Sequence, residues 1–133
     1  ALGARLSGAA IRVLGVNVCD DREYFVAIID AICRQFNQTW LPGESAEIPA
    51  YDIVDGYVGR GYAQSQPEEL AAIRDLVRLE GVVLDPVYTG KAHFGMMAEL
   101  AKNPKIFGDR IVFIHTGGLF GLFPIADQFA NIV

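Results

Sequence analysis

The spacing of apolar residues changes along the chain between the two-residue period of strands and the longer period of helices. Residues 11–18 alternate and are rich in Val and Ile, which predicts a strand. Asp20 or Asp21 can then cap a helix. Apolar side chains recur in that helix at helical spacing, at Phe25, Ile28, Ile29, Ile32 and Phe36. A short helix that Gly8 ends is predicted before the strand.

The middle of the chain repeats this order. Residues 51–58 contain strand-forming side chains. Pro67 suits the first position of a helix, two Glu residues follow it favourably, and Gly81 suits its end. The apolar stripe predicted for this helix is Leu70, Ile73 and Val77.

The last third predicts one more helix and one more strand. A helix opens at Thr89 or Gly90 and stops before Asn103-Pro104. Its predicted buried face is Ala92, Met96, Met97 and Leu100. Residues 111–114 are all apolar, which predicts a short buried strand.

Strands that alternate with helices indicate an α/β fold. We predict a single domain over residues 1–133, with three layers: a mainly parallel sheet between flanking helices. In such sheets ligands bind beyond the carboxyl ends of the strands.

Charge and composition exclude several classes of partner. The net charge is −5 and Lys and Arg form no cluster, which argues against nucleic acid and anionic membranes. No apolar run approaches the ~20 residues of a membrane-spanning helix. Cys19 and Cys33 lack the spacing of a metal site and are predicted to be buried thiols, with a disulfide or redox role as the alternative.

Four consecutive residues, His115-Thr116-Gly117-Gly118, follow the predicted strand 111–114 directly. Two glycines allow close approach of a ligand to the backbone, and the Thr hydroxyl can donate or accept a hydrogen bond. An ordinary strand-to-helix turn with a core histidine explains the same residues. Spacing alone leaves both interpretations open.

Two tyrosines and a lysine are the other candidates for chemistry. Tyr88 precedes a helix, and Tyr62 follows Gly59-Arg60-Gly61 in a loop. A phenol acts as acid or base when its pKa of ~10 is lowered, for example by a nearby cation. Lys91 is expected to be solvated or hydrogen-bonded rather than nucleophilic. His93 is expected to be structural, and no metal site is predicted.

Two segments carry a family resemblance. Residues 79–92, with Asp85-Pro86-Val87-Tyr88-Thr89-Gly90-Lys91, closely resemble a signature of the D-cysteine desulfhydrase and 1-aminocyclopropane-1-carboxylate (ACC) deaminase family. Residues 113–118 resemble a second one, and residues 55–62 match the family's segment before the same helix. The resemblance extends over nearly all of the chain. It implies the fold of the tryptophan synthase β chain, of which this chain is part of the large domain, and the cofactor pyridoxal phosphate (PLP).

The resemblance also implies roles for single residues. Thr116 corresponds to the residue beside the pyridine nitrogen of PLP, with Gly117 and Gly118 as cofactor-binding backbone. Tyr88 and Tyr62 correspond to two catalytic tyrosines that face the substrate, and Thr89 to a substrate-binding position.

Thr89 and Thr116 indicate the reaction within this family. ACC deaminases resemble one another in carrying Glu and Leu at these two positions, whereas desulfhydrase-like members carry Thr at both. The resemblance therefore favours α,β-elimination from D-cysteine to hydrogen sulfide, pyruvate and ammonia. ACC deamination, elimination from another β-substituted amino acid such as cysteate, and a non-catalytic binding or assembly domain stay open.

The resemblance covers the carboxy-terminal part of a family member. The family's Schiff-base lysine and phosphate-binding loop have no counterpart in these residues, so we expect the 133-residue chain alone to be inactive and to bind PLP weakly or not at all. Exposed apolar surface predicts self-association, as a homo-oligomer or with a missing portion. Members of the family that the chain resembles are commonly soluble homodimers, and we expect a cytoplasmic location.

Overall fold

A computed structural model describes residues 1–43 and 48–130, with the helix α5 traced to Ala130. The chain divides into two compact units. The first unit comprises residues 1–15 and 20–54, and the second comprises 16–19 and 55–133. Each unit is described by itself, and the single domain over 1–133 stays a prediction.

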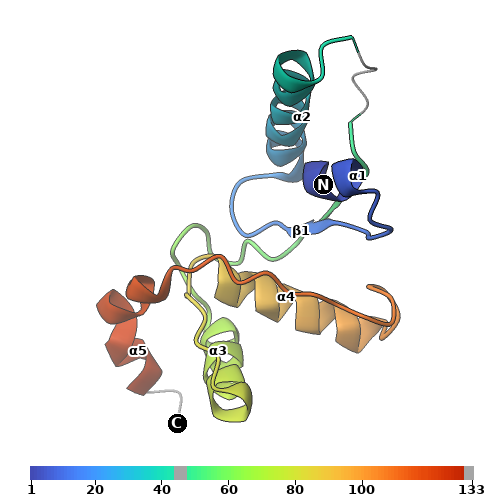
Figure 1. The fold of residues 1–133 in the computed structure, drawn as a ribbon. Coiled ribbons are helices and arrows are strands. Elements are labelled where there is room, and N and C mark those ends of the chain that lie inside the picture. Colours follow the sequence, from blue (N-terminus) through green and yellow to red (C-terminus); the bar gives the residue numbers. More distant parts are fainter. Residues whose placement is uncertain (44–47, 131–133) are drawn as a thin grey trace. The chain divides into compact units, whose positions relative to one another are not determined.

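The first unit begins with two helices and a pair of strands (Figure 1). Helix α1 spans Leu2–Ser7 and ends at Gly8, whose φ of 66° gives the left-handed conformation that glycine adopts without strain. Helix α2 spans Arg22–Trp40. Its first turn is capped by Asp21, whose carboxylate accepts the Tyr24 N–H at 2.7 Å. The predicted helix ends and caps are confirmed.

The strands of the first unit are shorter than predicted. Strand β1 covers Leu14–Val16 and strand β2 covers Asp52–Val54, and the two pair in a parallel two-stranded sheet with α2 between them in sequence. Arg22 at the start of α2 donates to the Ile53 carbonyl at 3.2 Å and to the Asp52 carboxylate at 2.9 Å. These bonds hold the helix to the second strand.

The buried face of α2 differs from the predicted stripe. Cys33 and Asn37 are the buried residues of this helix, whereas Ile32 is 54% exposed. Phe25, Ile29 and Phe36 of the predicted stripe are half-buried, and the buried Asn37 accepts a hydrogen bond from Arg5 at 3.2 Å. Neither the buried Cys33 nor the half-buried Cys19 forms a disulfide in the described part of the chain. The prediction of buried thiols is confirmed in full for Cys33 only.

The second unit is built on two packed helices, α3 over Pro67–Glu80 and α4 over Thr89–Lys102. Gly81 ends α3 with a φ of 68°, as predicted. Buried Leu70, Ile73 and Leu84 form the core, with four partly buried side chains packed around them: Leu76, Phe113, Ile125 and Phe129. Burial of apolar surface at about 25 cal/mol per Å² stabilises this arrangement.

The fully buried residues of α4 are small or polar, whereas the predicted Ala92, Met96 and Leu100 are only half-buried. Thr89, Gly90, Lys91 and Gly95 are buried, whereas Met97 is 48% exposed. A Cβ on Gly90 would lie 2.5 Å from Ile73 Cδ1. Close approach of α3 therefore decides which face of α4 is inside.

Residues 111–114 do not form the predicted strand. They run as irregular backbone, with Val112 88% and Ile114 75% exposed. A strand needs a neighbour for its backbone N–H and C=O groups, and the part of the chain that the structure describes pairs none with this segment. The chain then continues into a 3₁₀ helix, η1, over Leu119–Ile125 and helix α5 over Ala126–Ala130. Among the described residues, no helix is long and apolar enough to cross a membrane.

Candidate functional site

Asp85 organises the start of helix α4. Its carboxylate accepts backbone N–H groups of Val87 at 2.9 Å, Tyr88 at 2.7 Å and Thr89 at 2.8 Å. The first turn of a helix leaves such N–H groups without helical partners. The Asp85 carbonyl also accepts the Gly90 N–H at 2.7 Å. One buried residue therefore fixes the backbone from 87 to 90.

The charge of Asp85 is stabilised by these donors. Burial acts to raise the pKa of the carboxyl, but the hydrogen bonds from the Thr89 hydroxyl and from three backbone N–H groups outweigh it and hold the pKa below its usual range. Asp85 is thus an ionised carboxylate at neutral pH, committed to the helix start.

The hydroxyl of Thr89 belongs to the same network. It donates to the Asp85 carboxylate and accepts the Asp85 N–H at 2.9 Å. Its side chain is buried. Thr89 is therefore part of the buried network around Asp85. Its predicted contact with substrate stays a prediction.

Gly118 brings the second motif to the first. A Cβ on Gly118 would lie 2.8 Å from Asp85 Cβ, closer than real Cβ contacts allow. The φ angles of Gly117 and Gly118 are 97° and 92°, values that other residues adopt only with strain. The two predicted motifs are therefore adjacent, as the resemblance implies.

His115 secures this approach. Its Nδ1 accepts the Gly117 N–H at 2.9 Å, so that Nε2 carries the proton and donates to the Val83 carbonyl at 2.8 Å. Both ring nitrogens are thereby used within the chain. Like the neighbouring Thr116, His115 is exposed, so it is a hydrogen-bonded surface residue rather than the core histidine that the turn interpretation expected.

Tyr62 and Tyr88 meet at their phenol groups. The Tyr88 O–H donates to the Tyr62 oxygen at 2.9 Å, and the ring centroids lie 5.9 Å apart in an edge-to-face arrangement. Both side chains are exposed. The hydrogen bond to Tyr62, together with partial desolvation, raises the pKa of Tyr88 above that of a free phenol. Tyr88 is therefore protonated at neutral pH, rather than activated by the nearby cation that the sequence left open.

Sequence reasoning missed the importance of Asp85 and of Lys91. Lys91 is fully buried, not solvated, and its ammonium donates to the carbonyls of Val58 and Gly61. An Asp four residues before a Thr at a helix start is a detectable capping pattern. No comparable signal marks Lys91, because its partners are backbone atoms about 30 residues earlier.

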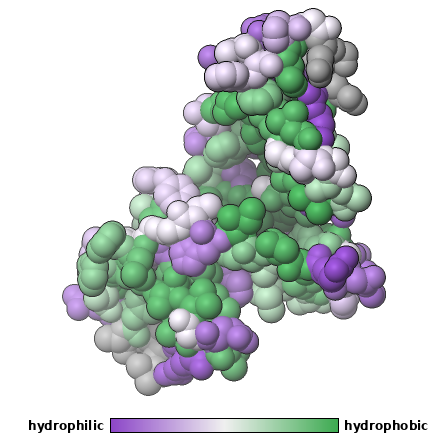
Figure 2. Space-filling model, in the orientation of Figure 1, coloured by the Kyte–Doolittle hydropathy of each residue, from purple (hydrophilic) through white to green (hydrophobic). Residues whose placement is uncertain are grey.

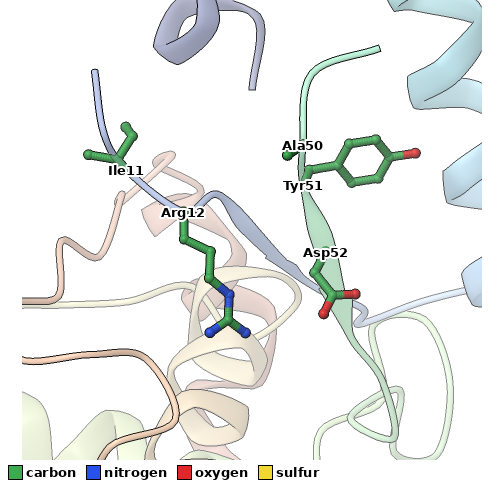
Figure 3. A pocket seen from close by; sticks show the side chains of 5 residues that line it. All are labelled: Ile11, Arg12, Ala50, Tyr51 and Asp52. Atoms are coloured by element: carbon green, nitrogen blue, oxygen red, sulfur yellow. The ribbon is translucent and has the colours of Figure 1, made fainter. Parts of the chain in front are cut away.

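A cavity lies elsewhere, in the first unit (Figure 3). It measures about 450 Å³ and is lined by Ile11, Arg12, Ala50, Tyr51 and Asp52. The Arg12 side chain extends on the side of the cavity that faces Asp52, whereas the Tyr51 ring points away from the cavity. The Tyr51 hydroxyl donates to the Asp30 carboxylate at 2.8 Å. None of the predicted site residues lines it, so the cavity does not define the candidate site.

In the part of the chain that the structure describes, the histidines and carboxylates do not gather into a metal site. No group of three His, Cys, Asp or Glu side chains converges among the described residues. His93 packs edge-to-face on Phe113, and burial lowers its pKa. His93 is thus placed as a structural residue, as expected.

Similarity to known proteins agrees with the two motifs. The chain is 40% identical over 135 residues to the bifunctional D-cysteine desulfhydrase/1-aminocyclopropane-1-carboxylate deaminase, mitochondrial, of Arabidopsis thaliana, which covers 99% of the chain and 32% of the relative. It is 36% identical over 114 residues to a putative 1-aminocyclopropane-1-carboxylate deaminase of Thermotoga maritima, in an alignment that covers 85% of the chain and 34% of the relative. The chain therefore spans about a third of the length of these relatives.

A solved structure and a family model give the fold and the family. The crystal structure of an ACC deaminase homologue superposes with a TM-score of 0.82 at 32% identity, covering 99% of this chain and 39% of the other. This confirms the α/β fold and its place as part of the PLP fold. The model of the pyridoxal-phosphate dependent enzymes matches residues 1–117. The chain therefore belongs to the family of pyridoxal-phosphate dependent enzymes, and its expected cofactor, pyridoxal phosphate, is the cofactor of that family.

Proposed function

We propose that the chain forms the substrate-facing and ring-nitrogen side of the site in a PLP-dependent lyase that carries out α,β-elimination on D-cysteine. The observation that carries this proposal is the phenol pair of Tyr62 and Tyr88, 2.9 Å apart at the start of α4. Asp85 connects that helix start to Gly118. The residues named by the resemblance thus occupy neighbouring positions in the second unit.

The residues around Thr116 fit one side of the cofactor. A Cβ on Gly117 would meet no atom within 4 Å, so the backbone there faces open space that a flat ring can fill. The exposed Thr116 hydroxyl can pair with the pyridine nitrogen, and Gly117 and Gly118 offer backbone at close range. When bound, PLP supplies the electron sink that stabilises negative charge on the substrate carbon beside the amino group. A neutral Thr116 partner leaves the ring nitrogen largely unprotonated.

The two tyrosines hold and deliver protons. The Tyr88 proton is engaged by the Tyr62 oxygen, so Tyr62 keeps its own O–H to donate to the substrate. The raised pKa of Tyr88 keeps that proton in place at neutral pH. The pair therefore serves as a proton donor and a hydrogen-bonding wall for the substrate, and it takes up a proton only when a bound cation lowers the pKa of one phenol.

Thr89 and Thr116 support D-cysteine as the substrate, because desulfhydrase-like members carry these residue types. In this reaction the Cα–H and Cβ–S bonds break, which releases hydrogen sulfide, and water then hydrolyses the remaining aminoacrylate to pyruvate and ammonia. ACC deamination is the alternative, since both activities stand in the name of the Arabidopsis relative. Elimination from another β-substituted amino acid such as cysteate uses the same groups. A binding or assembly domain without catalysis is the alternative from another class.

A chimaera tests the substrate. In this chimaera, residues 1–133 replace the matching segment of the Arabidopsis relative. Release of sulfide and of ammonia is measured with D-cysteine or with ACC as the substrate. We expect sulfide and pyruvate from D-cysteine, and a shift from D-cysteine toward ACC when Thr116 is changed to Leu. Thr39→Leu, at an exposed threonine of α2, is the matched control. Ammonia from ACC without sulfide from D-cysteine would overturn the substrate proposal, and a folded chimaera inactive on both substrates would favour the non-catalytic alternative.

We also propose that the 133-residue chain alone is inactive, since the resemblance assigns it no Schiff-base lysine, and that the protein resides in the cytoplasm. An absorbance band of lysine-bound PLP in the isolated chain would refute the first proposal. Cell fractionation tests the second, with a mitochondrial location, as in the name of the Arabidopsis relative, as the opposing outcome.

A further inference from the structure

Lys91 is a buried cation in the first turn of α4, three residues after Tyr88. It is fully buried, and its ammonium donates to the Val58 carbonyl at 2.7 Å and to the Gly61 carbonyl at 2.8 Å. A buried charge is costly unless hydrogen bonds compensate it. Among the described ion pairs none involves Lys91. The loop carbonyls therefore stabilise the charge, and the charge in turn holds the loop.

The loop from 58 to 63 needs such a bond. Its own backbone hydrogen bonds at Gly61 are long, at 3.3 Å to Val58 and at 3.3 Å from Gln64. Gly59 and Gly61 have φ values of 64° and 122°, and Ala63 has 56°, which is strained for a residue with a Cβ. The bonds from Lys91 are shorter and charge-assisted, which makes them stronger than neutral ones.

The carbonyl held by Lys91 belongs to the peptide that joins Gly61 to Tyr62. Fixing this peptide fixes the point from which the Tyr62 side chain starts. Tyr88, on the same helical turn as Lys91, meets the other end of that side chain at its phenol oxygen. One turn of α4 therefore holds Tyr62 at both its backbone and its tip.

We propose that Lys91 is a positioning residue: its ammonium holds the Gly61 carbonyl so that the Tyr62 and Tyr88 phenols meet. Its catalytic consequence rests on the proposed function of the two tyrosines, whereas the positioning itself does not. Lys91 touches neither phenol in the structure and carries no catalytic role of its own. A matched control exists in Lys105, an exposed lysine after α4 that pairs with Asp109.

Titration of the tyrosines tests the proposal. Tyrosine is labelled with carbon-13 in the full chain, and the Tyr88 signal is assigned with Tyr88→Phe. In Lys91→Met we expect the pKa of Tyr88 to fall toward the ordinary ~10 and its titration to coincide with that in Tyr62→Phe. Lys91→Gln, which keeps a donor without the charge, gives a smaller shift, and Lys105→Met gives none. An unchanged Tyr88 titration in folded Lys91→Met overturns the proposal, because a merely structural lysine changes stability alone.

Two further measurements separate the possible failures. If Lys91→Met and Lys91→Gln both lose their helical circular dichroism, proton–proton contacts from the Lys91 ε-methylene to the Gly61 and Tyr62 amides are measured in the unsubstituted chain. Their absence overturns the proposal and their presence supports it. In the chimaera, a moved Tyr88 titration with unchanged sulfide release supports the positioning by Lys91 and refutes the role of the tyrosines.

Discussion

The start of helix α4 and the segment from 111 to 118 carry the two motifs, yet they are held in different ways. At the helix start, Asp85, Thr89 and Lys91 are buried and joined by short hydrogen bonds to one another or to the loop before α3. The segment 111–118 is mostly exposed and is fixed by the ring of His115 and by the close contact of Gly118 with Asp85. The first motif builds its own framework, whereas the second depends on it.

The distribution of hydrophobic and polar residues also differs between the start of α4 and the segment after residue 110. Hydrophobic residues cover much of the visible surface of the second unit, coloured green (Figure 2). Within residues 111–123, four large or β-branched hydrophobic residues are each more than 70% exposed: Val112, Ile114, Phe120 and Phe123. Polar residues instead occupy the interior at the start of α4. Burial of polar groups is tolerated there because each named one has a hydrogen-bond partner.

Removal of the Asp85 carboxylate should have the largest effect. Asp85→Ala leaves three backbone N–H groups and the Thr89 hydroxyl without their acceptor, at a cost of about 3 kcal/mol in the free energy of unfolding. Urea denaturation measures it. Asp109→Ala, at an exposed surface pair, is the control and should change stability little. Equal effects of the two substitutions would contradict the capping role of Asp85.

The pH dependence of this term follows from the lowered pKa of Asp85. Because the folded-state pKa lies below the unfolded value of ~3.9, the stabilisation is fully present above about pH 4 and is lost as the pH falls through the folded-state pKa. The difference in unfolding free energy between the unsubstituted chain and Asp85→Asn should therefore shrink in acid. A difference that is constant from pH 6 to pH 2 would refute this account.

Substituting Gly117 and Gly118 should separate the cost of a steric clash with Asp85 from the cost of backbone strain. Gly117→Ala places a Cβ in open space at a positive φ, which costs about 1 kcal/mol. Gly118→Ala adds a clash with Asp85, for a total of about 2–3 kcal/mol. Thermal and urea unfolding of the pair test this order. Equal costs would show that Gly118 does not press on Asp85.

The two threonines give a matched pair in the same comparison. Thr89→Val keeps the shape but removes the hydroxyl, so the Asp85 N–H loses its acceptor, at about 1–2 kcal/mol. Thr116→Val changes an exposed side chain and should leave the free energy of unfolding nearly unchanged. In the chimaera the order should be the opposite: Thr116→Val should reduce sulfide release more than Thr89→Val does. Equal stability losses would show that both motifs are held alike.

The smallest effect on stability is expected at the exposed apolar residues. Val112→Ser together with Ile114→Ser removes hydrophobic surface that no described side chain covers, so stability changes little. We expect self-association of the unsubstituted chain to weaken in this variant, because large apolar patches favour association. Light scattering measures the mass. An unsubstituted chain of 14.5 kDa in solution would contradict the proposed oligomer.

The sequence by itself determined the helix ends and the family. Gly8 and Gly81, a capping Asp21 and an opening Pro67 fixed helix ends, because capping depends on residues a few positions apart. The two motifs indicated the family that similarity then confirmed. The resemblance also gave Tyr62 and Tyr88 as two residues that face the substrate, and the structure brings their phenol groups together.

Only the tertiary structure decided which faces are buried and which residues hold the site. Close packing of α3 turned the glycine and lysine face of α4 inward in place of Met97. Residues 111–114 stayed out of a strand because pairing, not composition, makes a strand. Lys91 acquired its partners from a loop about 30 residues away. Contacts between distant segments depend on how the helices pack, and apolar periodicity along one element does not contain that information.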